Sequence, residues 1–215
     1  AKTKKMKRIS KSVDIGIVGK YYKSGKFSLK DSYVSVLEAV NHAGWEIGVN
    51  PNIHWIVADD LENNKELQKE ILKMDGLIVP QGWGSRGAEG KIKAIQIARE
   101  NKIPYLGLCY GMQMSVVEFC RNVVGIKDAN SEEIDTKSKN LVIHLMEYQK
   151  EILKHQNYGG TIRLGAWPCK IKKGSLLESL YKKYTNSLYN TLPVVMERHR
   201  HRYEFNTKYS SLLQD

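Results

Sequence analysis

The sequence predicts an α/β fold in which a mainly parallel sheet carries helices on both faces and is followed by a mixed or antiparallel segment. Two observations favour the parallel sheet: short apolar runs alternate with amphipathic segments through the first half, and their spacing suits strands joined by crossover helices. A third observation distinguishes the second half of the sequence from the first: its strand-like runs have irregular connections. No internal repeat and no domain boundary is evident in the pattern.

The first half contains four apolar runs that read as buried strands. They cover residues 13–18, 53–57, 76–79 and 103–106. Apolar residues at helical spacing predict helices at residues 33–44, 61–74, 92–98 and 112–119, with Gly44 as the stop of the first.

The second half opens with a polar stretch, residues 127–136, which predicts a loop. Strands are expected at residues 141–145, 161–164 and 193–195, with a short helix at residues 176–183. These elements form the expected mixed or antiparallel segment.

The net charge is the one unusual feature of the composition. The 215 residues include 34 Lys and Arg against 23 Asp and Glu, a balance of +11 that favours an anionic partner. The charge concentrates in residues 1–12 and 170–183, which we interpret as a tail or linker and a solvated face. No nucleic-acid motif and no interleaved aromatic residues accompany it, so nucleic acid is disfavoured as a partner.

Membrane and secretory classes are also disfavoured. No window approaches the ~18 apolar residues of a membrane-spanning helix, and no long apolar run follows the basic start. The three cysteines, Cys109, Cys120 and Cys169, lack metal-ligand spacing, so we expect reduced thiols, a cytoplasmic protein and no metal site.

Cys109 lies in a turn with a glycine two residues to each side, Gly107 and Gly111, between a predicted strand and a predicted helix. Such an elbow strains its central residue and lifts that side chain clear of the sheet. A helix N-terminus favours thiolate, and the N–H of Tyr110 would face an oxyanion. The pattern predicts a nucleophile, although a small buried residue beside turn glycines gives the same pattern.

A glycine-rich loop, residues 80–87, leaves the neighbouring strand. Its glycines let backbone N–H groups approach a developing negative charge, and Gly82 is the candidate second oxyanion donor. An ordinary turn is the alternative. Cys120 fits the apolar pattern of the following helix and Cys169 follows Pro168, so both are interpreted as structural.

At these residues the chain resembles the class I glutamine amidotransferase family and, more narrowly, the glutaminase domains of CTP synthases. Further motifs carry the resemblance at residues 18–21, 86–90, 128–133, 159–165 and 197–204. It runs from residue 13 to residue 206 and implies a flavodoxin-like fold. We therefore expect residues 1–12 to be a basic linker or tail and residues 13–215 to be the amidotransferase domain, truncated at its C-terminus.

The resemblance also implies roles for individual residues. Cys109 would be the nucleophile that forms a glutamyl thioester, with Gly82 and Tyr110 as oxyanion donors. The glutamine site would comprise Gly82, Tyr110, Gly111, Met112, Gln113, Glu133 for the α-amino group, and Arg202 near the polar end of the substrate. Arg86, Gly87 and Glu89 match a lid through which GTP activates the family's glutaminase.

The partners implied are L-glutamine, GTP and an amidoligase domain of the same protein. The resemblance implies that ATP and Mg²⁺ support the amination of UTP to CTP in that domain, and that the whole enzyme is a homo-oligomer. The glutaminase domain itself is expected to need no cofactor.

The sequence departs from the family in three ways. Gln81 and Trp83 replace Gly and Phe in the glycine-rich loop, and Tyr110 replaces Leu. More seriously, no proline follows a histidine, so the family's His-Pro-Glu motif is absent and the chain alone is expected to be weakly active or inactive. His199 and His201 are poor substitute bases because they belong to another motif.

Two alternatives to the glutaminase interpretation stay open. The chain could be another cysteine-elbow α/β hydrolase, or a non-catalytic regulatory or assembly module. Without the resemblance, residues 198–202 would read as a solvated basic strand, or as a phosphate or RNA patch, and Glu133 as an ordinary loop acid.

Overall fold

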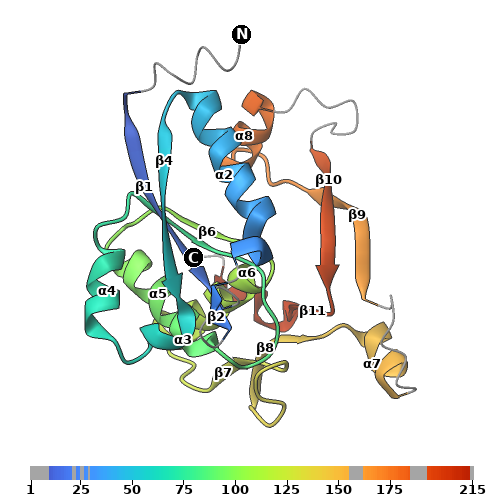
Figure 1. Ribbon diagram of the computed structural model, residues 1–215. Helices are drawn as coiled ribbons and strands as arrows, with labels where there is room; N and C mark the ends of the chain where they lie inside the picture. Colours follow the sequence, from blue (N-terminus) through green and yellow to red (C-terminus); the bar gives the residue numbers. More distant parts are fainter. Residues whose placement is uncertain are drawn as a thin grey trace. The chain divides into compact units, whose positions relative to one another are not determined.

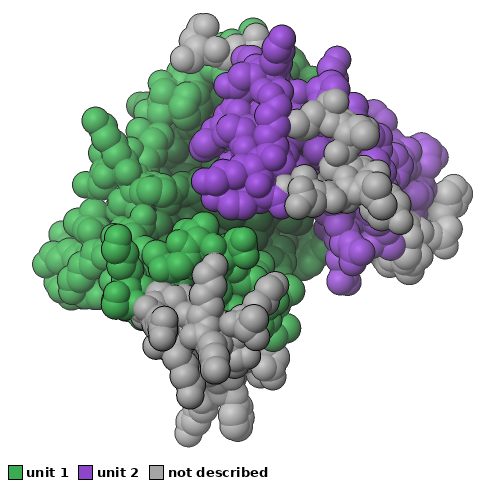
Figure 2. Space-filling model, turned by 90° about the horizontal axis from the view of Figure 1, so that it is seen from above, with its two compact units in different colours: residues 1–144, 203–215 green, residues 145–202 purple. Residues whose placement is uncertain are grey.

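A computed structural model describes residues 10–20, 23–24, 27–28, 30–154, 162–184 and 193–213 (Figure 1). The chain divides into two compact units, residues 1–144 with 203–215 and residues 145–202 (Figure 2). Parts of three predicted features lie outside the described residues, namely residues 1–9, residue 21 and residues 159–161. Within the described part, no helix combines the length and apolarity needed to span a bilayer.

The first unit is built on a four-stranded sheet in the order β4-β1-β5-β6. The strands are β1 (Ser12–Gly19), β4 (Asn50–Val57), β5 (Gly76–Val79) and β6 (Tyr105–Gly107). All three pairings are parallel, as predicted. Val79 pairs with Gly107, so β5 and β6 end side by side, and the segments that follow them start together at the carboxyl edge where open α/β sheets bind ligands.

Helices cover both faces of this sheet. The side chains of β1 alternate between the two faces, so its apolar residues pack against helices on each side. Ile17 packs with Val36 of α2 (Val34–Ile47) on one face. Val18 joins the larger core on the other face, to which α3 (Ala58–Leu61), α4 (Lys65–Ile71), α5 (Ala88–Glu100) and α6 (Tyr110–Asn122) contribute. The predicted α/β class with helices on both faces is confirmed.

Two predicted helices differ in the structure. The stop at Gly44 is wrong: α2 continues through it, since a Cβ there would lie 2.8 Å from Pro51, and ends at Gly48, whose φ of 80° suits glycine. The single helix at 61–74 is also wrong. The chain breaks between α3 and α4 (Lys65–Ile71), where the Asn64 side chain accepts the N–H groups of Glu66 and Leu67 and starts a new helix.

The predicted loop at 127–136 contains a short strand, β7 (Ala129–Ser131), paired in parallel with β8 (Asn140–Leu145). The sheet to which they belong has the order β11-β8-β7 and includes β11 (Tyr203–Phe205). The smaller elements are β2 (Lys23–Ser24), β3 (Phe27–Ser28) and the 3₁₀ turns η1 (Lys30–Tyr33) and η2 (Thr207–Leu213).

The second unit holds the antiparallel pairing that the sequence predicted. β9 (Arg163–Lys170) pairs with β10 (Val194–His201) along eight residues of each strand. Two helices belong to the same unit, α7 (Glu147–Lys154) and α8 (Leu176–Tyr184), of which the sequence predicted only α8. Of the basic run at residues 198–202, the first four residues lie on β10 and Arg202 follows it.

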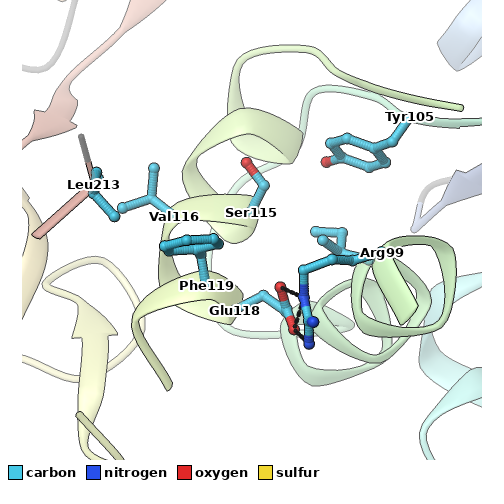
Figure 3. A pocket seen from close by; sticks show the side chains of 8 residues that line it. Arg99, Tyr105, Ser115, Val116, Glu118, Phe119 and Leu213 are labelled. Carbon is cyan, nitrogen blue, oxygen red and sulfur yellow. Dashed lines mark hydrogen bonds and ion pairs between the residues drawn. The ribbon is translucent and has the colours of Figure 1, made fainter. Parts of the chain in front are cut away.

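A pocket of about 410 Å³ opens beside α5 and α6 (Figure 3). In it the guanidinium of Arg99 makes bidentate hydrogen bonds to the carboxylate of Glu118, whose side chain is 1% exposed. The residues that line the pocket include none of the predicted site residues. We therefore assign it to the packing of the two helices.

Candidate active site

Cys109 occupies the strained elbow that the sequence predicted. It lies between β6 and α6 with φ 53° and ψ −106°, a backbone conformation that residues other than glycine rarely adopt. The residue is exposed, and Gln113 donates its N–H to the Cys109 carbonyl in the first turn of the helix. The strained elbow therefore presents a thiol at the carboxyl edge of the parallel sheet.

The flanking glycines are required by the crowding of the backbone. A Cβ on Gly111 would lie 1.8 Å from the carbonyl oxygen of Val79, which no shift of a flexible side chain could relieve. A Cβ on Gly107 would lie 2.7 Å from the amide nitrogen of Met112. The spacing of the motif is thus dictated by the approach of α6 to the ends of β5 and β6.

The electrostatic surroundings of Cys109 differ from the expectation of a thiolate. Although the residue as a whole is exposed, desolvation of its sulfur by nearby protein atoms raises the pKa of Cys109, and the N–H of Tyr110 lowers it by less. The charge of Glu133 raises this pKa further and that of Lys91 lowers it. Because the net shift is upward, the helix N-terminus does not by itself make the thiolate the resting form.

The glycine-rich loop follows β5 and is held mainly by two lysine side chains from other elements. Lys20, directly after β1, donates from its Nζ to the carbonyls of Trp83, Gly84 (3.1 Å) and Arg86 (3.0 Å). Lys91, on α5, donates from its Nζ to the carbonyl of Pro80 at 2.7 Å. Sequence reasoning assigned neither lysine a role. For Lys91 a signal was available in the sequence: it lies one helical turn before Ile95, on the apolar face of the helix, which indicates a buried lysine.

Tyr110 lies against both lysines and the loop. Its ring centroid is 4.9 Å from the Nζ of Lys20 and 5.4 Å from that of Lys91, and its hydroxyl donates to the carbonyl of Gly84 at 2.7 Å. The side chain is buried. Tyrosine in place of the family's leucine therefore adds a hydrogen bond to the loop. The backbone N–H of residue 110, the predicted oxyanion donor, is present with either side chain.

Glu133, which follows β7, reaches the same loop. Its Oε1 accepts the N–H of Gly84 at 2.8 Å. Burial raises the pKa of Glu133, while the Gly84 N–H and the charge of Lys20 partly offset that rise. The Glu133 carboxylate is thus held beside the glycine-rich loop, which is the position expected of a group that binds the ammonium of a substrate.

Met112 and Gln113, like Tyr110 and Gly111, are predicted glutamine-site residues in the first turn of α6. The side chain of Met112 is 42% exposed. The Gln113 side chain is buried instead and donates from its Nε2 to the carbonyl of Tyr203 at 3.0 Å. Its amide group is thus occupied by β11, and its predicted contact with substrate stays a prediction.

Arg202 and the two histidines belong to the second unit. There Arg202 donates from Nη1 to Oε1 of Gln149 at 2.6 Å. His199 Nδ1 and His201 Nε2 lie 2.7 Å apart, and burial lowers the pKa of His199. The role of Arg202 beside the substrate stays a prediction.

The predicted lid residues contact α3 and α6. Arg86 donates from Nε to Oδ2 of Asp59 at 2.9 Å. Gly87 has φ 68°, and a Cβ there would lie 2.8 Å from Oδ1 of the same aspartate. Glu89 pairs with Arg121 at 2.8 Å. Asp59 is a contact that the sequence did not predict.

The other two cysteines lie on a helix and on a strand, away from the elbow in sequence. Cys120 is fully buried in the core around α6, and Cys169 lies on β9. Neither forms a disulfide in the part of the chain that the structure describes. The described residues also contain no group of three or more His, Cys, Asp or Glu side chains placed to hold a metal ion.

A strained cysteine elbow beside a glycine-rich loop, on a parallel α/β sheet, is the arrangement expected of hydrolases and amidotransferases that use a cysteine nucleophile. The family model for glutamine amidotransferase class-I matches residues 28–215, and the chain belongs to that family. A solved structure described as the glutaminase domain of Trypanosoma brucei CTPS with bound acivicin superposes with a TM-score of 0.80. It is 38% identical, and the match covers 94% of this chain and 71% of that one. Within the family, the chain is therefore a glutaminase domain of the CTP synthase type.

Curated CTP synthases show the same relationship. Those of Carboxydothermus hydrogenoformans and Saccharolobus solfataricus are 49% and 48% identical over 94% and 95% of this chain. The matches cover 34% and 35% of those proteins, so this chain spans about a third of their length.

Proposed function

We propose that this chain hydrolyses L-glutamine through a thioester at Cys109 and supplies ammonia to a synthase domain that converts UTP to CTP. The observation that carries the proposal is the strained elbow at Cys109, placed next to the glycine-rich loop by the pairing of β5 with β6. Family membership makes glutamine the substrate that fits this geometry.

The chemistry proceeds in two displacements. The Sγ of Cys109 attacks the carboxamide carbon of glutamine, and the N–H groups of Tyr110 and Gly82 stabilise the oxyanion. The C–N bond then breaks, and the nitrogen takes up the thiol proton and leaves as ammonia. Water attacks the thioester, the C–S bond breaks, and a proton from water returns to sulfur as glutamate leaves. We do not propose His199 or His201 as the proton carrier, because they belong to another motif and their ring nitrogens contact each other.

Substrate recognition uses charge complementarity. Glutamine carries an ammonium and a carboxylate, and Glu133 is the group proposed to bind the ammonium. Gly111, Met112 and Gln113 are proposed to line the site, and Arg202 to lie near the polar end of the substrate.

The remaining partners follow from the CTP synthase relatives. We propose that Arg86, Gly87 and Glu89 form a lid that responds to GTP, and that ATP and Mg²⁺ act in the synthase domain. The whole enzyme is proposed to be a homo-oligomer of the cytoplasm, where the free thiols of this chain would stay reduced.

Intact-mass analysis after treatment with acivicin tests the proposal. We expect one adduct on the wild-type chain, and none on Cys109→Ala, while a Cys169→Ser variant labels like wild type. Equal labelling of wild type and Cys109→Ala would overturn the site. No labelling of the wild type would favour a non-catalytic module.

A further inference from the structure

Two lysines are almost completely buried beneath the glycine-rich loop, although neither is required by the chemistry described above. The exposed fraction is 2% for Lys20 and 0% for Lys91. Lysine is almost never buried to this extent unless its charge or its N–H groups are partnered. Here the partners of both lysines are backbone carbonyls of the glycine-rich loop, so the buried amines can fix the conformation of that loop.

The contacts of the two lysines are with carbonyl oxygens. Lys91 Nζ lies 2.7 Å from the Pro80 oxygen and 3.5 Å from that of Gln81. Lys20 Nζ donates to the carbonyls of Trp83, Gly84 and Arg86. A trans peptide unit is planar, so its N–H points opposite to its C=O. Holding the carbonyls on the lysine side therefore turns the N–H groups of the loop to the other side.

One N–H of the loop shows this alternation directly. The carbonyl of Trp83 faces Lys20, and the N–H of the same peptide unit, that of Gly84, donates to Glu133 at 2.8 Å. The N–H of Gly82 shares a peptide unit with the Gln81 carbonyl, which faces Lys91. The same geometry thus directs the Gly82 N–H away from the lysines.

We propose that Lys20 and Lys91 are positioning residues that orient the glycine-rich loop so that the N–H of Gly82 faces the oxyanion formed at Cys109. The proposal rests on the proposed glutaminase function. The lysines bracket Gly82 itself, since a Cβ on this residue would lie 3.2 Å from Lys20 Cδ and 3.5 Å from Lys91 Nζ. Both lysines contact carbonyl oxygens of the loop, so we assign their effect on the oxyanion to the backbone, separate from the effect of the Lys91 charge on the pKa of Cys109.

The surroundings explain how two lysines are buried together. The Tyr110 ring lies against both nitrogens and offers them its negatively polarised face. Burial and the neighbouring Lys20 lower the pKa of Lys91 to about 7, and Cys109 opposes that shift. Burial also lowers the pKa of Lys20, which Glu133 and Asp59 oppose. A neutral amine keeps N–H donors, so both protonation states can bind the loop carbonyls.

The test compares two reagents that modify the same thiol. 6-Diazo-5-oxo-L-norleucine is a glutamine analogue whose ketone oxygen needs the oxyanion donors, whereas iodoacetamide is attacked directly by the thiolate. Maximal modification rates at Cys109 are measured for both reagents, at a pH where the thiol is ionised. For Lys91→Met we expect the first rate to fall about 100-fold or more, and the second to change less than about threefold.

Matched variants separate this role from a general loss of structure. Lys93→Met lies on the same helix, where its nitrogen contacts Gln96 at 3.1 Å, and it should leave both rates unchanged. Lys91→Gln keeps one donor for the Pro80 carbonyl and should recover part of the loss, which also serves as the test if Lys91→Met does not fold. Lys20→Met should show the same selective loss as Lys91→Met.

The outcomes distinguish the two proposals. Modification of wild-type Cys109 by iodoacetamide but not by the diazoketone would overturn the proposed function and this inference with it. Diazoketone modification of the wild type with an equal rate in Lys91→Met and Lys20→Met would overturn the inference alone. An equal loss with both reagents would also overturn it, because the lysines would then act on the thiol and not on the loop.

Discussion

The Oε1 atom of Glu133 accepts a hydrogen bond of 2.8 Å from the backbone N–H of Gly84. This contact joins the end of β7 to the loop that follows β5, across 49 residues of sequence. It leaves a carboxylate at the loop, where the second carboxylate oxygen can accept a hydrogen bond from an ammonium group. The first two predictions follow from this relationship.

Glu133→Gln should weaken binding of a glutamine analogue about 10- to 100-fold, because a charge-assisted hydrogen bond to the ammonium becomes a neutral one. The measurement is the concentration dependence of acivicin labelling at Cys109. Glu132→Gln, one residue away, is the control and should behave like wild type. A loss confined to the maximal rate would contradict a role of Glu133 in binding.

The same substitution should change how stability depends on pH. Because burial raises the pKa of Glu133, the folded chain binds this proton more tightly than the unfolded chain. The stabilising contribution is therefore complete below the carboxyl's unfolded pKa and is lost as pH rises through the folded one. Urea unfolding from pH 4 to pH 8 should show Glu133→Gln gaining stability relative to wild type as pH increases. A relative loss with rising pH would show that the pKa is lowered.

Alkylation of Cys109 by iodoacetamide should follow the thiol pKa. Since burial of the sulfur raises this pKa, the rate should keep increasing at pH values where an ordinary cysteine is already ionised. The rate is measured by mass spectrometry in a Cys169→Ser background, so that the half-buried thiol of β9 does not contribute. A plateau reached below the ordinary cysteine range would mean that the helix N-terminus outweighs burial.

Gly111→Ala should destabilise the chain by about 3 kcal/mol or more, because its Cβ would lie 1.8 Å from the Val79 carbonyl oxygen. Gly48→Ala is the matched control. That glycine has φ 80° and no atom within 4 Å of the added Cβ, so its cost is limited to about 1–2 kcal/mol of backbone strain. Urea unfolding gives both values, and equal losses would show that α6 can move away from β5.

Glu118→Gln should cost about 3 kcal/mol in the free energy of unfolding, because it breaks the bidentate pair with Arg99 at a carboxylate whose side chain is 1% exposed. The comparison is Glu89→Gln, whose side chain is 45% exposed in its pair with Arg121 and should lose less than about 1 kcal/mol. Chemical denaturation of both variants at neutral pH decides the order. A larger loss at Glu89 would reverse the ranking by burial.

Local patterns in the sequence were enough for the parallel sheet and the elbow. The alternation in β1 and the glycines around Cys109 are properties of a few neighbouring residues, and the structure confirms both. Helix ends were predicted less well, because Gly44 is required by contact with Pro51 and not by a change of backbone conformation. Asn64 was an available capping signal that the prediction did not use.

By itself, then, the sequence determined the fold class, the position of the candidate nucleophile and the family resemblance, since periodicity and short motifs are encoded in adjacent residues. Only the tertiary structure decided which distant groups surround that nucleophile. Lys20, Lys91 and Glu133 meet the glycine-rich loop because the strand order β4-β1-β5-β6 and the packing of α5 bring separate segments to one edge. Buried charges at that edge persist because the loop backbone satisfies them, a pairing that no single stretch of sequence contains.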